Sequence, residues 1–435
     1  MSSTKQTSLA DSSTFQYDDS IDFAIKLDAE DPLRQYRNQF FIPAAGERTE
    51  CIYLAGNSLG LQPRKARTYI EQELDDWANL GVEGHFEAKN PWLPYHEKLT
   101  DMSARLVGAK PSEVVVMNTL TVNLHLMMVS FYRPTKERFK IVTESGAFPS
   151  DQYAVASQAK FHGYNPEETI IELTPRDGES ILRTDDMIAL IEKEGDQVAL
   201  IMLGDVNYLT GQAFEVEKIA KAARAKGCTI GLNLAHGAGN LLLKLHDWDV
   251  DFAVWCSYKY LNAGPGGLSG CFVHEKHATN FDLPRFAGWW GHNKKDRFKM
   301  GPQFDPIPGA EGWQLSNPPI FQLAALRASL EIFDAATMTA IREKSVRITG
   351  YLEYLLNQLP QGFCSIITPK NPEERGSQLS IRLAKDPKDM LEALKREGAI
   401  CDFRNPDIIR ATPIPLYVRY QDVFDFAKIL ARFAS

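Results

Sequence analysis

Between about residues 110 and 260, short runs of apolar and β-branched residues alternate with segments in which apolar residues recur every three or four positions. Runs of the first kind predict buried strands, and the longer segments predict amphipathic helices. The predicted strands are residues 114–117, 140–143, 169–173, 198–203, 228–232 and 251–256. The predicted helices are residues 123–131, 151–162, 184–193 and 216–226, the last ended by Gly227.

This alternation predicts an α/β fold with a mostly parallel sheet that helices cover on both faces. Ligands of such sheets bind in the crevice at the carboxyl ends of the strands. The residues that directly follow the predicted strands are therefore the candidates for chemistry.

The pattern changes after about residue 318. Helical segments at 320–333 and 339–359 precede a predicted strand at 377–383 and a final helix at 421–433. We expect a small α+β C-terminal domain at 319–435, completed by an N-terminal segment at 15–70 that packs on it. Residues 71–318 then form the large domain, and the Ser- and Thr-rich residues 1–14 form a flexible tail.

Composition narrows the class of protein. The 435 residues are 44% hydrophobic and 24% charged, as in soluble globular proteins. The net charge of −8 gives no electrostatic reason to expect nucleic acid or an anionic membrane as partner. No apolar run reaches the roughly 18 residues of a membrane span, and nothing at the start indicates a signal peptide.

Cysteine usage favours the cytoplasm over an oxidising compartment. The six cysteines are scattered without a C-x-x-C pair, which predicts free thiols rather than disulfides or zinc ligands. His274 and His277 stand three apart, but no acidic or thiol ligand set accompanies them, so we expect a solvated turn and no metal site.

Lys259 is the strongest candidate for chemistry. The predicted strand at 251–256 runs into Ser257-Tyr258-Lys259 and then into a glycine-rich turn at 264–267. A lysine at this strand end reaches the crevice, where desolvation and nearby cations lower its pKa and make it a nucleophile for an aldehyde. The alternative, a surface lysine before a loop, is disfavoured by these flanking residues.

Two other strand ends carry polar residues. Asn233 and His236 follow the strand at 228–232, and they fit either the edge and face of a planar heterocycle or a hydrogen-bonded core. Thr121 opens a helix after a strand, so it fits either a phosphate seat or a simple N-cap. Phe148, also between a strand and a helix, offers a ring for stacking.

Together these segments resemble kynureninase, a fold-type-I pyridoxal-phosphate enzyme, over nearly the whole chain. Besides the lysine segment, the resemblance rests on residues 53–63 (YLAGNSLGLQP), 120–125 (LTVNLH), 148–151 (FPSD), 245–252 (LHDWDVDF), 316–320 (SNPPI), 401–406 (CDFRNP) and 413–417 (PIPLY). The length of these matches exceeds what a shared fold alone gives.

The resemblance implies the cofactor pyridoxal 5′-phosphate and assigns roles by position. Lys259 would hold the cofactor as a Schiff base and remove the substrate's Cα proton, and Tyr258 would contact the phosphate and donate a proton. The remaining cofactor-binding positions would be Leu120 and Thr121 at the phosphate, Phe148, Asp151, Gly204, Asn233 and His236 at the ring, and Trp289 and Asn317, which complete the pocket partly across a dimer interface.

The resemblance also implies the substrate site. Arg410 would bind the α-carboxylate through its planar fork, while His85, Ser58 and Asn317 would lie near the aromatic end. The implied protein is a homodimer of tryptophan catabolism and NAD biosynthesis. It would hydrolyse the Cβ–Cγ bond of kynurenine or 3-hydroxykynurenine to an anthranilate and alanine.

Two positions depart from the family pattern. The family has aspartate at 233 to pair with the pyridinium nitrogen, and it often offers a hydroxyl at 204, whereas this chain has Asn233, Gly204 and an extra carboxylate at Asp205. A neutral amide predicts a weaker electron sink, so Asn233→Asp is expected to raise turnover. Three explanations fit this departure. Position 233 is an engineered change, or the chain is a paralogue that acts on another γ-keto or aryl amino acid or is weakly active or inactive. In the third, Asp205 partly compensates for the missing charge.

Overall fold

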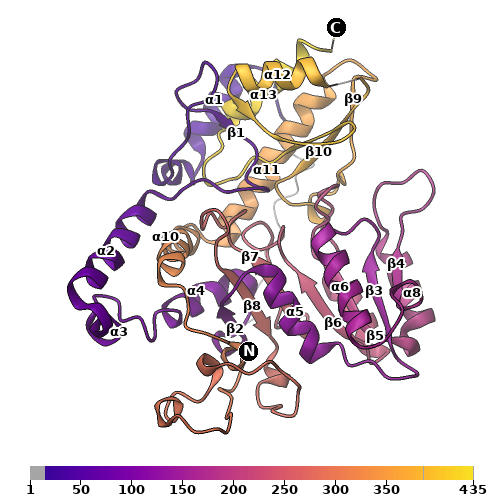
Figure 1. Cartoon of the computed structure of the whole chain (residues 1–435). Coiled ribbons are helices and arrows are strands. Elements are labelled where there is room, and N and C mark those ends of the chain that lie inside the picture. The colour runs from indigo at the N-terminus through magenta and orange to yellow at the C-terminus, as the bar shows by residue number, and fades with distance from the viewer. Residues whose placement is uncertain (1–14, 386, 435) are drawn as a thin grey trace, which may run out of the picture.

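A seven-stranded sheet forms the centre of the larger part of the protein in the computed structural model, which describes residues 15–385 and 387–434 (Figure 1). The strand order is β2-β8-β7-β6-β5-β3-β4. The strands are β2 (Val114–Val116), β3 (Lys140–Glu144), β4 (Ile170–Leu173), β5 (Val198–Gly204), β6 (Thr229–Asn233), β7 (Phe252–Cys256) and β8 (Ser269–Val273). All six predicted strands are confirmed, each within two residues at either end, and the predicted tail at 1–14 lies outside the described residues.

The sheet is mostly parallel, as predicted. β8, the strand that the sequence pattern did not predict, is antiparallel to both β7 and β2. Its sequence, SGCFV, contains little of the β-branched signal that marks the other strands.

Helices cover both faces of the sheet. α5 (Leu120–Phe131) and α6 (Pro149–Phe161) share one hydrophobic core with Val115, while α8 (Thr184–Glu194) and α9 (Val216–Ala225) share the other with Val114 and Val116. This split follows from the two-residue period of a strand, which sends successive side chains to opposite faces. The four predicted helices are confirmed, and Gly227 follows α9 with a φ of +67°.

The C-terminal part contains an antiparallel sheet of order β12-β13-β10-β9. Its strands are β9 (Cys364–Ile366), β10 (Leu379–Leu383), β12 (Asp402–Arg404) and β13 (Ile408–Ala411). Its helices are α11 (Met338–Asn357), α12 (Lys388–Arg396) and α13 (Tyr420–Ala431).

The N-terminal segment lies beside this C-terminal part (Figure 1). β1 (Ile52–Tyr53) pairs in parallel with β11 (Ala399–Ile400), and α1 (Ile21–Glu30) contacts α13. The carboxylate of Asp28 accepts hydrogen bonds from the first backbone N–H groups of α13. These contacts support the predicted packing of residues 15–70, and the domain boundaries themselves stay a prediction.

A helical arm projects from the large sheet (Figure 1). It consists of α2 (Arg64–Leu80) and the short α3 (Gly84–Glu87), and α2 and α4 (Glu97–Val107) both pack on α10 (Ile320–Ala336). The remaining short helix is α7 (Pro166–Thr169). Across residues 15–385 and 387–434, no helix combines the length and apolarity needed to cross a bilayer.

Candidate active site

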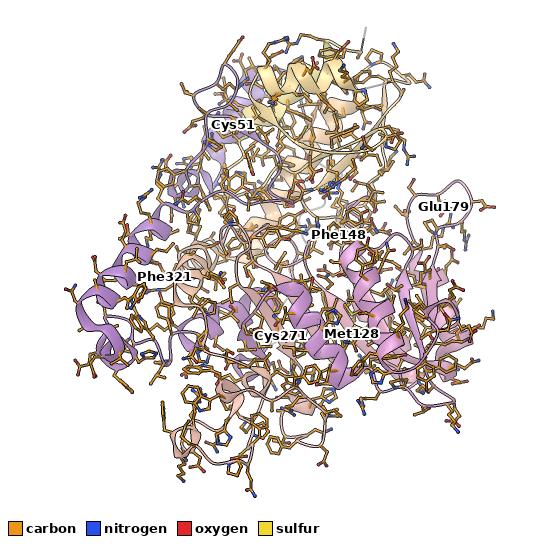
Figure 2. All side chains as sticks on the ribbon, viewed as in Figure 1. Cys51, Met128, Phe148, Glu179, Cys271 and Phe321 are labelled. Carbon is orange, nitrogen blue, oxygen red and sulfur yellow. The ribbon has the colours of Figure 1, made fainter. Side chains whose placement is uncertain are left out.

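A cavity of about 250 Å³ lies where the large sheet's strands end, as the α/β pattern predicted. Phe148, one of the lining residues, is labelled in Figure 2, where it lies between the sheet and the C-terminal strands. The lining residues are Thr119, Leu120, Thr121, Glu144, Phe148, Ser150, Asp151, Gly204, Val206, Tyr208, Asn233, Ala235, His236, Cys256, Tyr258, Lys259, Gly266, Gly267 and Ser269.

Lys259 extends into this cavity from the turn after β7. Its Nζ lies 3.1 Å from Nε2 of His236 and 5.7 Å from the ring centre of Phe148. Desolvation lowers the pKa of Lys259, and repulsion from Arg410 adds to the effect. Burial also lowers the pKa of His236 well below its usual value, which favours a neutral imidazole whose Nε2 shares a hydrogen bond with the amine. This environment favours a nucleophilic amine.

Asn233 and Asp151 form a polar pair in the cavity wall. The Asn233 Nδ2 donates a hydrogen bond of 2.7 Å to Asp151 Oδ2, and Asn233 Oδ1 accepts one of 3.0 Å from the backbone N–H of Ala235. Asp151 Oδ1 is buried without a partner among the described residues. Desolvation raises the pKa of Asp151 to about 6, against the opposing effects of Asn233 and Lys259. The pair therefore offers one unused carboxylate oxygen.

Two more buried carboxyl groups lie near this pair. Glu144 ends β3 and lines the cavity beside Gly204, where an added Cβ would stand 3.2 Å from Glu144 Oε1. Asp205 is not among the lining residues, and its carboxyl group lies against Gly237 instead. Desolvation raises the pKa of each of these two acids to about 8. Asp205 therefore does not supply the charge that residue 233 lacks.

The N-terminus of α5 forms one end of the cavity. Leu120 and Thr121 occupy its first turn, where backbone N–H groups have no partner within the helix. Tyr258 lines the same cavity, and burial raises the pKa of its phenol to about 12. The phenol is thus protonated at neutral pH.

Five predicted residues, Arg410 among them, do not line the cavity of the single chain. Trp289, in a 3₁₀ helix at Trp289–Gly291, is 40% exposed and donates to the Arg297 carbonyl. Asn317 and Ser58 are exposed, and His85 Nδ1 lies 2.9 Å from the Val82 carbonyl oxygen in the helical arm. Their predicted roles remain untested.

Arg410 also lies just outside the lining of the cavity. It is buried on β13, and its Nη1 donates a hydrogen bond of 2.7 Å to the backbone carbonyl of Tyr208, a lining residue. Its Nη2 forms an ion pair with Asp402. The guanidinium thus lies next to the cavity in a fixed orientation.

Sequence reasoning missed several lining residues. Glu144 follows the strand predicted at 140–143, and Tyr208 lies in the turn after β5, so the rule of strand ends applied more strictly would have found both. Ser269 begins β8, which the pattern did not predict, so no signal pointed to it. The lining residues Val206 and Cys256 are apolar or weakly polar and are indistinguishable in sequence from core residues.

The turn after β8 differs from the expected solvated turn. His274 is 7% exposed, its ring stacks on His246, and its Nδ1 accepts a hydrogen bond from the Lys276 N–H. Glu113 accepts hydrogen bonds at both carboxylate oxygens. His246 Nδ1 lies 2.9 Å from Glu113 Oε1, so Glu113, His246 and His274 form one cluster, and acidic and histidine side chains do accompany His274.

Solved structures with the same fold include cysteine desulfurases. One from Thermococcus onnurineus matches with a TM-score of 0.73 and 18% identity, covering 88% of this chain and 94% of that one. One from Escherichia coli matches with a TM-score of 0.74 and 17% identity, covering 92% and 98%. The fold is that of the fold-type-I pyridoxal-phosphate enzymes.

Sequence comparison is more specific. The family model of the kynureninase C-terminal domain matches residues 341–430. The kynureninase of Myxococcus xanthus is 65% identical over 96% of this chain and 98% of its own length. The kynureninase of Koribacter versatilis is 59% identical over 95% and 97%. By fold, cavity and sequence, the chain belongs to the kynureninase family.

Proposed function

We propose that the protein hydrolyses the Cβ–Cγ bond of L-kynurenine or 3-hydroxy-L-kynurenine, with pyridoxal phosphate as cofactor, to give an anthranilate and L-alanine. The observation that carries this proposal is the position of Lys259 in the cavity. Its amine lies between a neutral histidine and an aromatic ring, where it is desolvated and reactive. The family membership supports the same reaction.

The cavity fits pyridoxal phosphate in three ways. The first turn of α5 suits the phosphate because its N–H groups and dipole attract anions. Phe148 has its ring exposed for stacking, with an edge-on contact to Tyr208 at 5.3 Å. The unused oxygen of Asp151 suits the protonated ring nitrogen. We assign Leu120, Thr121, Phe148, Asp151, Gly204, Asn233 and His236 to cofactor binding.

Bound pyridoxal phosphate supplies the electron sink for a carbanion at the substrate's α-carbon. Lys259 is then free to remove the α-proton, since desolvation lowers the pKa of its amine and so favours the neutral form. Tyr258 remains protonated under these conditions and is the proton donor of the later steps. Water adds to the γ-carbonyl before the bond between Cβ and Cγ breaks.

Asp151 and Asn233 together carry one negative charge. The amide of Asn233 occupies one carboxylate oxygen of Asp151, and the other, which is buried and unpartnered, would turn towards the cavity to meet the ring nitrogen. An asparagine side chain hydrogen-bonded to an aspartate carboxylate has nearly the same shape as two aspartate side chains that share one proton. The two pairs also have the same net charge. The electron sink therefore keeps its counter-charge despite the departure at position 233.

The substrate site is assigned from the surroundings of the cavity. Arg410 is next to the cavity and suits the α-carboxylate. Ser58, His85, Trp289 and Asn317 lie outside the cavity of one chain, and we propose that a second copy in a homodimer brings some of them to it. We also propose a cytoplasmic location and a role in tryptophan catabolism, the first supported by the six free thiols.

The test is incubation of the holoenzyme with L-kynurenine and 3-hydroxy-L-kynurenine, with formation of the anthranilate followed by fluorescence. We expect cleavage of at least one substrate. Lys259→Ala is expected to abolish both the cleavage and the absorbance of the lysine-bound cofactor. A parent protein that shows this absorbance but cleaves neither substrate would contradict the proposal and favour a different γ-keto or aryl amino acid.

A further inference from the structure

Two arginines share one aspartate beside the cavity. Asp402 lies directly opposite Arg410 in the register of β12 and β13. Its Oδ2 accepts from Nη2 of Arg410 and, at 3.2 Å, from Nη2 of Arg404. The Arg410 side chain is 2% exposed and that of Asp402 is 11% exposed, whereas that of Arg404 is 40% exposed. A single carboxylate oxygen thus serves both guanidinium groups.

The hydrogen bonds of these groups are incomplete. Arg410 uses Nη1 for the Tyr208 carbonyl and Nη2 for Asp402, but its Nε is buried without a partner in the described part of the chain. The Nε of Arg404 is buried and unpartnered in the same way. Unpartnered charged donors are costly when buried, so an acceptor that reached them would stabilise the cluster. Two guanidinium groups and one carboxylate also leave an excess of one positive charge.

This excess charge acts on the cavity. Desolvation is the main cause of the lowered pKa values of Lys259 and His236, and repulsion from both Arg410 and Arg404 adds to it at each site. Asp151 and Cys256 act on Lys259 in the opposite direction. A ligand carboxylate of charge −1 next to Arg410 would therefore neutralise the excess positive charge of Arg404, Arg410 and Asp402.

We infer that Arg404 is a positioning residue for the substrate's α-carboxylate: it retains Asp402 while the carboxylate binds Arg410. This inference rests on the proposed function, in which Arg410 binds that carboxylate. Without substrate, the hydrogen bond to Asp402 fixes the orientation of the Arg410 guanidinium group. With substrate, two carboxylates and two guanidinium groups form a neutral set, and Asp402 shifts towards its pair with Arg404.

Ligands with and without a carboxylate test this inference. L-Alanine carries the α-carboxylate, and L-alaninamide has a neutral amide in its place. Binding of each to the holoenzyme is followed through the change in the cofactor's absorbance. Arg404→Gln is expected to weaken L-alanine binding about tenfold or more and to leave L-alaninamide binding within about twofold, because only the charged group competes with Asp402. Arg404→Lys is expected to restore part of the loss.

A matched control is Arg382→Gln on β10, the strand on the other side of β13 from Arg404. Arg382 also pairs with an aspartate, Asp407, at 3.7 Å and is 45% exposed, so the change in charge and exposure is similar. It should leave both affinities unchanged, and the melting temperatures of all variants check folding.

The inference is overturned if Arg404→Gln weakens both ligands equally, weakens neither, or if the parent binds L-alanine no better than L-alaninamide. Binding of L-alanine requires no C–C cleavage. A protein that shows the Arg404-dependent preference but cleaves neither kynurenine would contradict the proposed function and not the role of Arg404.

Discussion

The side-chain amide of Asn233 donates a 2.7 Å hydrogen bond to the carboxylate of Asp151. At this distance, an aspartate at position 233 would have to share a proton with Asp151, because two adjacent carboxylates cannot both ionise at low cost. Asn233 supplies the donor that this shared proton would otherwise provide. This contact leads to a different expectation from the one drawn from sequence, in which loss of the aspartate weakens the electron sink, and the two expectations differ in the outcome of Asn233→Asp.

Asn233→Asp should therefore change little. We expect turnover of kynurenine and cofactor affinity within about threefold of the parent, since the pair retains one negative charge near pH 7. Steady-state kinetics and an absorbance titration with pyridoxal phosphate measure both quantities. A tenfold or greater rise in turnover would restore the original expectation and place the missing charge at position 233.

Asp151→Asn is expected to have a much larger effect, because it removes the counter-charge itself. Cofactor affinity should fall at least tenfold and turnover about 100-fold, as for loss of a charge-assisted contact in a buried site. Asp177→Asn, at an exposed position, is the control of equal charge. Normal cofactor affinity in Asp151→Asn would exclude Asp151 as the partner of the ring nitrogen.

The pKa of Asp151 predicts that cofactor affinity depends on pH. Asp151 has its pKa raised to about 6, mainly by desolvation, so its carboxylate is present above that pH and protonated below it. Cofactor affinity of the parent should fall as the pH is lowered through about 6, and this step should be absent in Asp151→Asn. Titrations between pH 5 and 8 check the prediction, within the range where the protein stays folded.

Tyr258→Phe separates proton donation from cofactor binding. The phenol of Tyr258 has a pKa of about 12, so it is a proton donor at neutral pH. We expect kcat to fall about 100-fold, the usual order for loss of a general acid, with a smaller change in the cofactor's dissociation constant. Equal losses in both quantities would assign Tyr258 to phosphate binding alone.

Asp205→Asn should stabilise the protein in a manner that depends on pH. Burial raises the pKa of Asp205 from 3.8 to about 8, so the folded state holds a proton that the unfolded state loses. The stability that this proton provides is complete below the unfolded pKa and is lost as the pH rises towards 8. The variant's melting temperature should exceed that of the parent by several degrees at pH 8 and match it near pH 4. A difference in melting temperature that stays constant between pH 4 and pH 8 would show that titration of Asp205 is not the cause.

Much of the fold follows from local pattern, because buried parallel strands and amphipathic helices have different periods. The β-branched run at 198–203 and the helix before Gly227 are examples that the structure confirms. Strand β8 was not predicted from the sequence. Its glycine and cysteine are buried between β2 and β7, two strands that lie far apart in sequence. Its pairing is a tertiary effect with no local signal.

The candidate site was predictable where a strand end carries an unusual polar residue, as at Lys259 and Asn233. The contact between Asn233 and Asp151 was not, because 82 residues separate them and only the sheet order brings them together. The sequence likewise did not predict that Arg404 and Arg410 share Asp402. A sequence identifies which groups are present, whereas the register of strands decides which of them compete for one partner.

The parallel pairing of β1 with β11 joins residue 52 to residue 399. During synthesis, the partner of β1 emerges only after most of the chain has been made, so the N-terminal segment must wait while the large sheet folds. Such distant contacts raise the contact order and slow the final docking step. A chain shortened at its C-terminus would therefore leave its beginning unpaired as well, and limited proteolysis of nascent or truncated chains should cut first between residues 15 and 60.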